Sequence, residues 1–98
     1  MITKTIEKEA TLSEEGTVIA VALHEEWPHS ISFKVYVSYQ YESGFWSDRI
    51  LVKIMSGIKK KGIYNSGLLS TNAGRIENVR VRLVCEHDAD INLSLINI

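Results

Sequence analysis

Residues 30–41 read Ser-Ile-Ser-Phe-Lys-Val-Tyr-Val-Ser-Tyr-Gln-Tyr, and their alternation is the strongest indication of the fold. Every second position carries an apolar or aromatic side chain: Ile31, Phe33, Val35, Val37, Tyr39 and Tyr41. The positions between them hold Ser32, Lys34, Tyr36, Ser38 and Gln40. Successive side chains of a strand point to opposite faces, so a period of two predicts a β-strand with one buried face and one solvated face.

The same pattern recurs along the chain in short runs that turn residues separate. We expect strands at 2–12, 17–23, 30–41, 48–55, 63–70, 75–86 and 91–95. The run 17–23 is apolar on both parities, which favours a central strand, and in 48–55 we expect Ile50, Val52 and Ile54 to share the inner face. Seven such runs without a helical period predict an all-β fold, a seven-stranded antiparallel β-sandwich of Greek-key or jelly-roll type. A small β-barrel is the alternative.

Length and composition narrow the class of protein. The 98 residues predict a single domain, 1–98, and a hydrophobic fraction of 45% supplies one core. A net charge of −1 gives no general attraction for nucleic acid or anionic membranes, so we expect no nucleic-acid partner. We expect no signal peptide, no membrane span and, with Cys85 as the single cysteine, no internal disulfide.

Some apolar residues fall on the polar parity of their strands. These residues are Leu51, Met55, Val84, Ile96 and Ile98. One interpretation is burial on both faces of a central strand, or a bulge that resets the parity. The other is a second apolar surface that binds a protein partner or another copy of the chain, and this makes the five residues candidate interface residues.

Aromatic residues in two loops are candidate ligand-binding groups. Trp27 lies in the loop 24–29, whereas Phe45 and Trp46 lie in the loop 42–47, which we expect at the opposite end of the fold. Exposed tryptophans stack on sugars or anchor protein partners, but they also cap the open ends of sandwich cores. Tyr36 and Gln40 share the polar parity of their strand and, with Arg80 or Arg82, are candidates for a ligand platform on one sheet face.

Motifs for metal binding and catalysis are sparse. Asp88, Asp90 and Asn92 have the local spacing of a calcium loop, although the glycine and glutamate of that loop are missing. They are the candidate metal ligands, and calcium is the one cofactor that we consider. Cys85 has the inward parity of a small buried residue. The sequence contains no nucleophile elbow, phosphate loop or dinucleotide motif, so we expect no enzyme.

The strand pattern is similar to that of small jelly-roll modules in carbohydrate-binding domains and in viral or phage fibre and capsid-associated proteins. This resemblance is one of fold and implies a binding or structural role. We therefore predict a non-catalytic interaction module in a homo-oligomeric or larger assembly, such as a viral or surface appendage. The alternative is a lectin-like, carbohydrate-binding module that uses the loop aromatics, with or without calcium.

Overall fold

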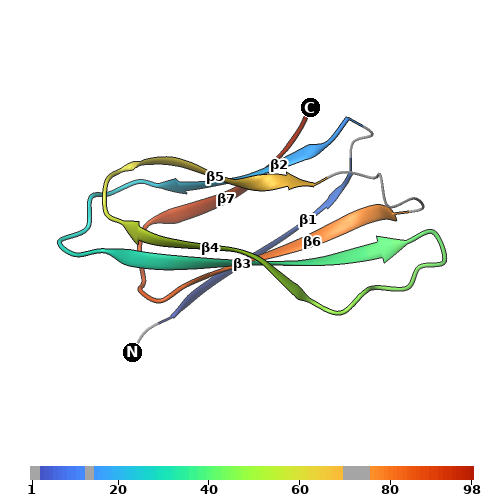
Figure 1. Ribbon diagram of the computed structural model, residues 1–98, viewed down its shortest axis with the longest axis horizontal. Helices are drawn as coiled ribbons and strands as arrows, with labels where there is room; N and C mark the ends of the chain where they lie inside the picture. Colours follow the sequence, from blue (N-terminus) through green and yellow to red (C-terminus); the bar gives the residue numbers. More distant parts are fainter. Residues whose placement is uncertain (1–2, 13–14, 70–75) are drawn as a thin grey trace.

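Two antiparallel sheets form the computed structural model, which describes residues 3–12, 15–69 and 76–98 (Figure 1). The strands are β1 (Lys4–Thr11), β2 (Thr17–Leu23), β3 (Ile31–Tyr41), β4 (Ile50–Ile58), β5 (Gly62–Leu69), β6 (Ile76–Cys85) and β7 (Ile91–Asn97). One sheet has the order β1-β6-β3-β4 and the other the order β5-β2-β7. The prediction of a seven-stranded antiparallel sandwich is confirmed, and the described strands do not close into a barrel. The predicted strand ends at residues 2, 70 and 75 lie outside the described residues.

Most neighbouring strands are far apart in the sequence. Of the pairs that the structure describes, only β3 and β4 are consecutive along the chain, while β1 pairs with β6 and β2 with β7. The β2–β3 and β3–β4 connections lie at opposite ends of the sandwich, as the sequence predicts (Figure 1). β4 and β5 are edge strands of their sheets and follow one another through a short turn at residues 59–61.

The core lies between the two sheets and follows the period-two pattern. Its largest fully buried side chains come from β2, β3, β6 and β7: Phe33, Ile19, Leu23, Ile31, Leu83, Leu93, Val21, Val35, Val37, Val79 and Val81. The central position of β2 explains why its sequence is apolar on both parities, since Ala20 on its other face is also buried. Burying a side chain of this size stabilises the fold by roughly 1.5–3 kcal/mol.

The faces of β4 differ from the prediction. Val35 pairs with Lys53, but the next residue, Tyr36, pairs with Leu51, so Val52 has no partner on β3. An extra residue of this kind is a β-bulge, and it exchanges the faces of the residues on either side of it. Ile50, Val52 and Ile54 consequently do not share a buried inner face, and the sequence prediction for them is wrong.

Met55 also departs from its expected role. It pairs with Phe33 on the inner side of the sheet and is only 8% exposed. A second register shift lies between Ile31 and Phe33, where β4 contains Gly57 with φ 71°, and β4 continues to Ile58. Met55 therefore belongs to the core of the single chain, in accordance with the bulge interpretation.

Candidate functional site

The face of the four-stranded sheet that is turned away from the core, here called the outer face, gathers most of the chemistry. Antiparallel pairing sets its residues in rows that cross the sheet from β1 to β4. One row contains Glu7, Arg82, Tyr36 and Leu51. Another contains Thr11, Asn78, Gln40 and Trp46, the last through an isolated bridge beyond the end of β3. Residues from four separate parts of the chain thus share one surface.

Ion pairs connect β1 and β6 on this face. Arg82 Nε donates a hydrogen bond to Glu7 Oε2 at 2.9 Å, and Arg80 Nη2 donates one to Glu9 Oε1 at 3.2 Å. The hydrogen bond from Arg82, with the charges of the neighbouring arginines, lowers the pKa of the Glu7 carboxyl. The two arginines are therefore neutralised by two glutamates on the same face.

The β3–β4 connection positions Trp46. Tyr41 N–H donates to Phe45 O at 2.9 Å, and Gly44, with φ 88°, adopts the left-handed conformation that this tight turn requires. Ser47 N–H then donates to Tyr39 O at 2.7 Å, so the chain after the turn returns beside β3. Trp46 is thereby placed next to Gln40, with its side chain on the outer face.

Arg80 and Trp46 form a cation–π contact. Arg80 Cζ lies 4.3 Å from the centroid of the indole ring, within the range over which a guanidinium is attracted to an aromatic face. Because Arg80 is also bound to Glu9, the ring is fixed on one side by a residue that is itself held in place.

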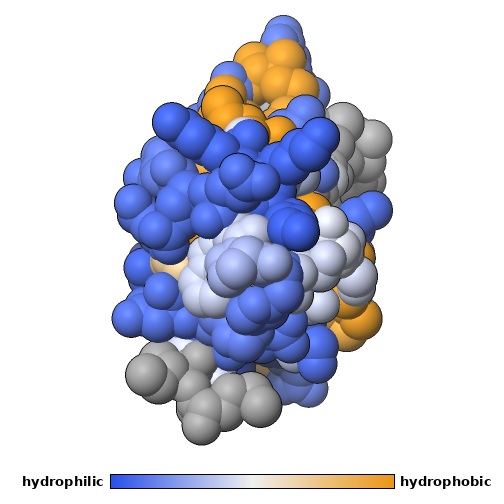
Figure 2. Space-filling model, turned by 90° about the vertical axis from the view of Figure 1, so that its left-hand side faces the viewer, coloured by the Kyte–Doolittle hydropathy of each residue, from blue (hydrophilic) through white to orange (hydrophobic). Residues whose placement is uncertain are grey.

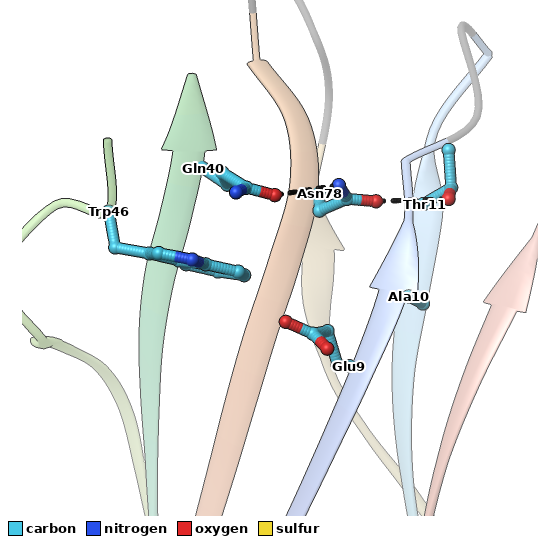
Figure 3. Close-up of a pocket in the computed structure, with 6 residues that line it drawn as sticks. All are labelled: Glu9, Ala10, Thr11, Gln40, Trp46 and Asn78. Atoms are coloured by element: carbon cyan, nitrogen blue, oxygen red, sulfur yellow. Dashed lines mark hydrogen bonds between the residues drawn. The ribbon is translucent and has the colours of Figure 1, made fainter. Parts of the chain in front are cut away.

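A shallow hollow of about 360 Å³ lies beside this tryptophan. It is lined by Glu9, Ala10, Thr11, Gln40, Trp46 and Asn78, which come from β1, β3, β6 and the β3–β4 connection (Figure 3). Thr11 Oγ1 donates to Asn78 Oδ1 at 3.0 Å, and Asn78 Nδ2 donates to Gln40 Oε1 at 2.8 Å. This hydrogen-bonded row and the indole ring form adjacent sides of the hollow.

Three of the five predicted ligand-binding residues lie on the outer face. Tyr36 and Gln40 are half-buried there on β3. Trp46, in the β3–β4 connection, lies next to Gln40 on the same face. Phe45 lies instead at the tip of the turn, 68% exposed, with its ring stacked on Tyr41 at a centroid distance of 6.4 Å.

Trp27 is at the other end of the sandwich. It packs against the core and stacks on His87, with 5.1 Å between the ring centroids. His29 lies edge-on to both rings. Figure 2 shows this end as a mainly hydrophilic surface with a central area of intermediate hydropathy. This arrangement corresponds to the capping interpretation of Trp27, and the structure does not bring Trp27 together with Trp46.

The second exposed feature is a group of aliphatic side chains on β4, here called the β4 flank. It consists of Ile50, Leu51, Val52 and Ile54, which are 51%, 43%, 40% and 52% exposed. Leu51 lies opposite Tyr36, and Ile54 lies opposite Lys34, so both are on the outer face. β4 is an edge strand, and no described strand pairs with its free edge.

The other predicted interface residues are more scattered. Val84 is half-buried on the outer face, where it lies opposite Thr5 and Lys34. Ile96 and Ile98 are 53% and 58% exposed at the end of the chain, on or just beyond β7. β7 is an edge strand of the three-stranded sheet, whereas β4 belongs to the four-stranded sheet. These two isoleucines are therefore not part of the β4 flank.

Two of the three predicted calcium ligands contact other side chains through their own side chains, and the third makes its contact through the backbone. Asp88 lies 4.0 Å from the ammonium of Lys4, and Asn92 Nδ2 lies 2.9 Å from His24 Nε2. The backbone N–H of Asp90 donates to Glu25 Oε1 at 3.2 Å. In the part of the chain that the structure describes, no three His, Cys, Asp or Glu side chains form a group suited to a metal ion. The contacts therefore give no support to a calcium loop at 88–92.

Cys85 is fully buried at the end of β6, and burial raises the pKa of its thiol. A reactive cysteine needs a lowered pKa and access to solvent. The prediction that Cys85 acts as a small core residue agrees with its position.

The sequence patterns do not single out Glu9, Thr11 and Asn78 as residues of the hollow. All three have the outward parity of their strands, and that signal was present in the sequence. Their meeting with Gln40 and Trp46 depends on β6 lying between β1 and β3, which the period of two does not reveal.

The structure defines a β-sandwich that carries two exposed features on one sheet, the hollow at Trp46 and the β4 flank. Comparison of the chain with protein-family models, with curated proteins and with solved structures found no match in any of the three. Within residues 3–12, 15–69 and 76–98, no helix is long and apolar enough to cross a membrane.

Proposed function

We propose that this protein is a non-catalytic assembly module in which β4 pairs with β4 of a second copy. The β4 flank supports this proposal. Edge strands of soluble proteins usually carry charges, prolines or covering segments, because an exposed apolar edge pairs with other chains. β4 has one charge among its residues, Lys53, yet it presents four large aliphatic side chains to solvent on the edge of its sheet.

The bulge at Val52 makes the β4 flank complementary to itself. Residues that lie opposite each other across an antiparallel pair share one face of the sheet. Leu51 and Ile54 are both on the outer face, so Leu51 of one copy can lie opposite Ile54 of the other, and the reverse contact follows from the two-fold symmetry.

The same register satisfies the other side of the sheet. It sets Ile50 opposite Met55 of the second copy, both on the inner side, and Val52 opposite Lys53. Arg49 then lies opposite Ser56, so no two like charges face each other directly. A slip of one residue would set outer-face residues opposite inner-face residues. The proposed register is therefore favoured over the two registers that differ from it by one residue.

The test is the mass of the protein in solution, measured by light scattering after size exclusion. The protein concentration is varied about a hundredfold, a range that covers about 2.7 kcal/mol in the free energy of association. We expect a dimer at the upper end of the range. Ile54→Lys sets a charge against Leu51 at two symmetric contacts and should weaken the dimer by at least about a hundredfold.

Ile96→Lys is the matched control, because Ile96 is equally exposed but lies on β7. It should leave the mass unchanged. A monomer at all concentrations would contradict the proposal. Loss of the dimer with Ile96→Lys but not with Ile54→Lys would place the contact on β7 instead.

A further inference from the structure

The hollow at Trp46 lies apart from the β4 flank and does not depend on pairing of β4. Its lining residues come from β1, β3, β6 and the β3–β4 connection, with none from β4. Its volume of about 360 Å³ is at the lower end of the range of small-molecule sites, roughly 300–1,000 Å³. The hollow is therefore large enough for a small polar ligand or one part of a longer chain.

The hollow combines a rigid aromatic wall with fixed polar groups. Arg80 covers one face of the Trp46 ring and is not among the residues that line the hollow, so the hollow borders the remainder of the ring. The hydrogen bonds from Thr11 to Asn78 and from Asn78 to Gln40 hold the polar row in place. Groups that are fixed before binding lose little entropy when a ligand binds.

The polar row retains both donors and acceptors. Gln40 and Asn78 each have two amide protons, and the row uses one proton of Asn78 and none of Gln40. Gln40 Nε2 donates one of its protons to Gly44 O at 3.2 Å, which leaves the other. Thr11 Oγ1 and the Glu9 carboxylate supply acceptors on the opposite side (Figure 3). A ligand that matches both kinds of group must itself donate and accept, as hydroxyl groups do.

The charges around the hollow compensate each other. Glu7 and Glu9 are bound to Arg82 and Arg80, so the four charges sum to zero. An anion or a cation would have to compete with these ion pairs, whereas an uncharged ligand would not.

From these properties we propose that the hollow binds an uncharged sugar residue of an oligosaccharide, with its C–H face on Trp46 and its hydroxyl groups on Asn78, Gln40 and Glu9. A pyranose ring has an apolar face for the indole and vicinal hydroxyl groups for the amide row. Pairing of β4 does not require a sugar, and sugar binding does not require pairing of β4. Either proposal can therefore fail without the other.

The test uses Trp27→Phe, in which Trp46 is the single fluorescent tryptophan. This variant is titrated with cellohexaose, maltohexaose, mannohexaose, xylohexaose and hexa-N-acetylchitohexaose, and with hexagalacturonate as the anionic control. We expect a saturable change in emission with at least one neutral oligosaccharide and none with hexagalacturonate. Asn78→Ala in the same background should weaken binding by about 3–10-fold, the effect of one lost hydrogen bond.

Two controls separate this site from other surfaces. Calorimetry with the 98-residue chain that retains Trp27 should show that Trp46→Ala abolishes binding and that Ile54→Lys leaves it unchanged. The proposal is overturned if none of the five neutral oligosaccharides gives a saturable response up to about 10 mM. Unchanged binding by Trp46→Ala would overturn it as well.

Discussion

Tyr36 of β3 lies opposite Leu51 of β4, while Val35 beside it lies opposite Lys53, so that Val52 is an unpaired extra residue. In a regular strand, residues three positions apart point to opposite faces. The bulge instead turns Leu51 and Ile54 to the same face, where both are exposed. Bulges are frequent on edge strands, where they redirect side chains and disrupt regular pairing. In the proposed pair of β4 strands, the match of Leu51 with Ile54 depends on this single residue.

The two phenylalanines should differ sharply in their contribution to stability. Phe33 is fully buried between the sheets, so Phe33→Ala should lower the free energy of unfolding by about 3–5 kcal/mol. Phe45 is exposed at a turn, so Phe45→Ala should change it by no more than about 0.5 kcal/mol. Urea denaturation followed by circular dichroism measures both, and equal losses would contradict the assignment of the core.

The Cys85 thiol should be unreactive in the folded protein. It is fully buried, and burial raises its pKa, so both access to reagent and the thiolate fraction are low. With a disulfide reagent such as Ellman's reagent at pH 8, we expect reaction only at the rate of unfolding and immediate reaction in denaturant. Rapid reaction of the native protein would show that the end of β6 is open to solvent.

The ion pair between Glu7 and Arg82 should make stability depend on pH. The hydrogen bond from Arg82 lowers the pKa of Glu7 below its ordinary value of 4.5, so the folded state favours the ionised carboxylate. The resulting stabilisation is present above that ordinary value and is lost as the pH falls through the lowered pKa. The difference in urea midpoint between the wild type and Glu7→Gln should accordingly be larger at pH 7 than at pH 3. A difference that does not change with pH would show that the pair contributes nothing to folding.

Periodicity alone predicts most of the fold. The alternation in 30–41 and the turn residues between the runs were enough to place seven strands and to recognise β2 as central. The faces of β4 were not predictable, because a bulge depends on how Val35, Tyr36 and their partners meet across two strands. Parity makes Met55 a candidate interface residue unless a bulge resets the faces, and its position in the core agrees with the bulge.

The candidate site was predictable only in part. Tyr36 and Gln40 were assigned to one sheet face because parity within a single strand is enough for that. Glu9 and Asn78 join them only because β6 lies between β1 and β3, and this order comes from long-range pairing. The calcium prediction depends on spacing along the chain, whereas Asp88 lies near Lys4 on β1 and Asn92 lies near His24, which follows β2.

Pairing of β4 with its copy through Leu51 and Ile54 can be detected by cysteine cross-linking. Opposite residues in antiparallel strands have Cβ atoms roughly 4.5–5.5 Å apart, close to the separation that a disulfide needs. Like residues of the two copies are offset in this register by three positions, roughly 10 Å, which a disulfide does not span. We therefore expect a covalent dimer under mild oxidation when Leu51→Cys is mixed with Ile54→Cys, and none with either variant alone. Equal cross-linking of each variant alone and of the mixture, or none in any of them, would contradict the account.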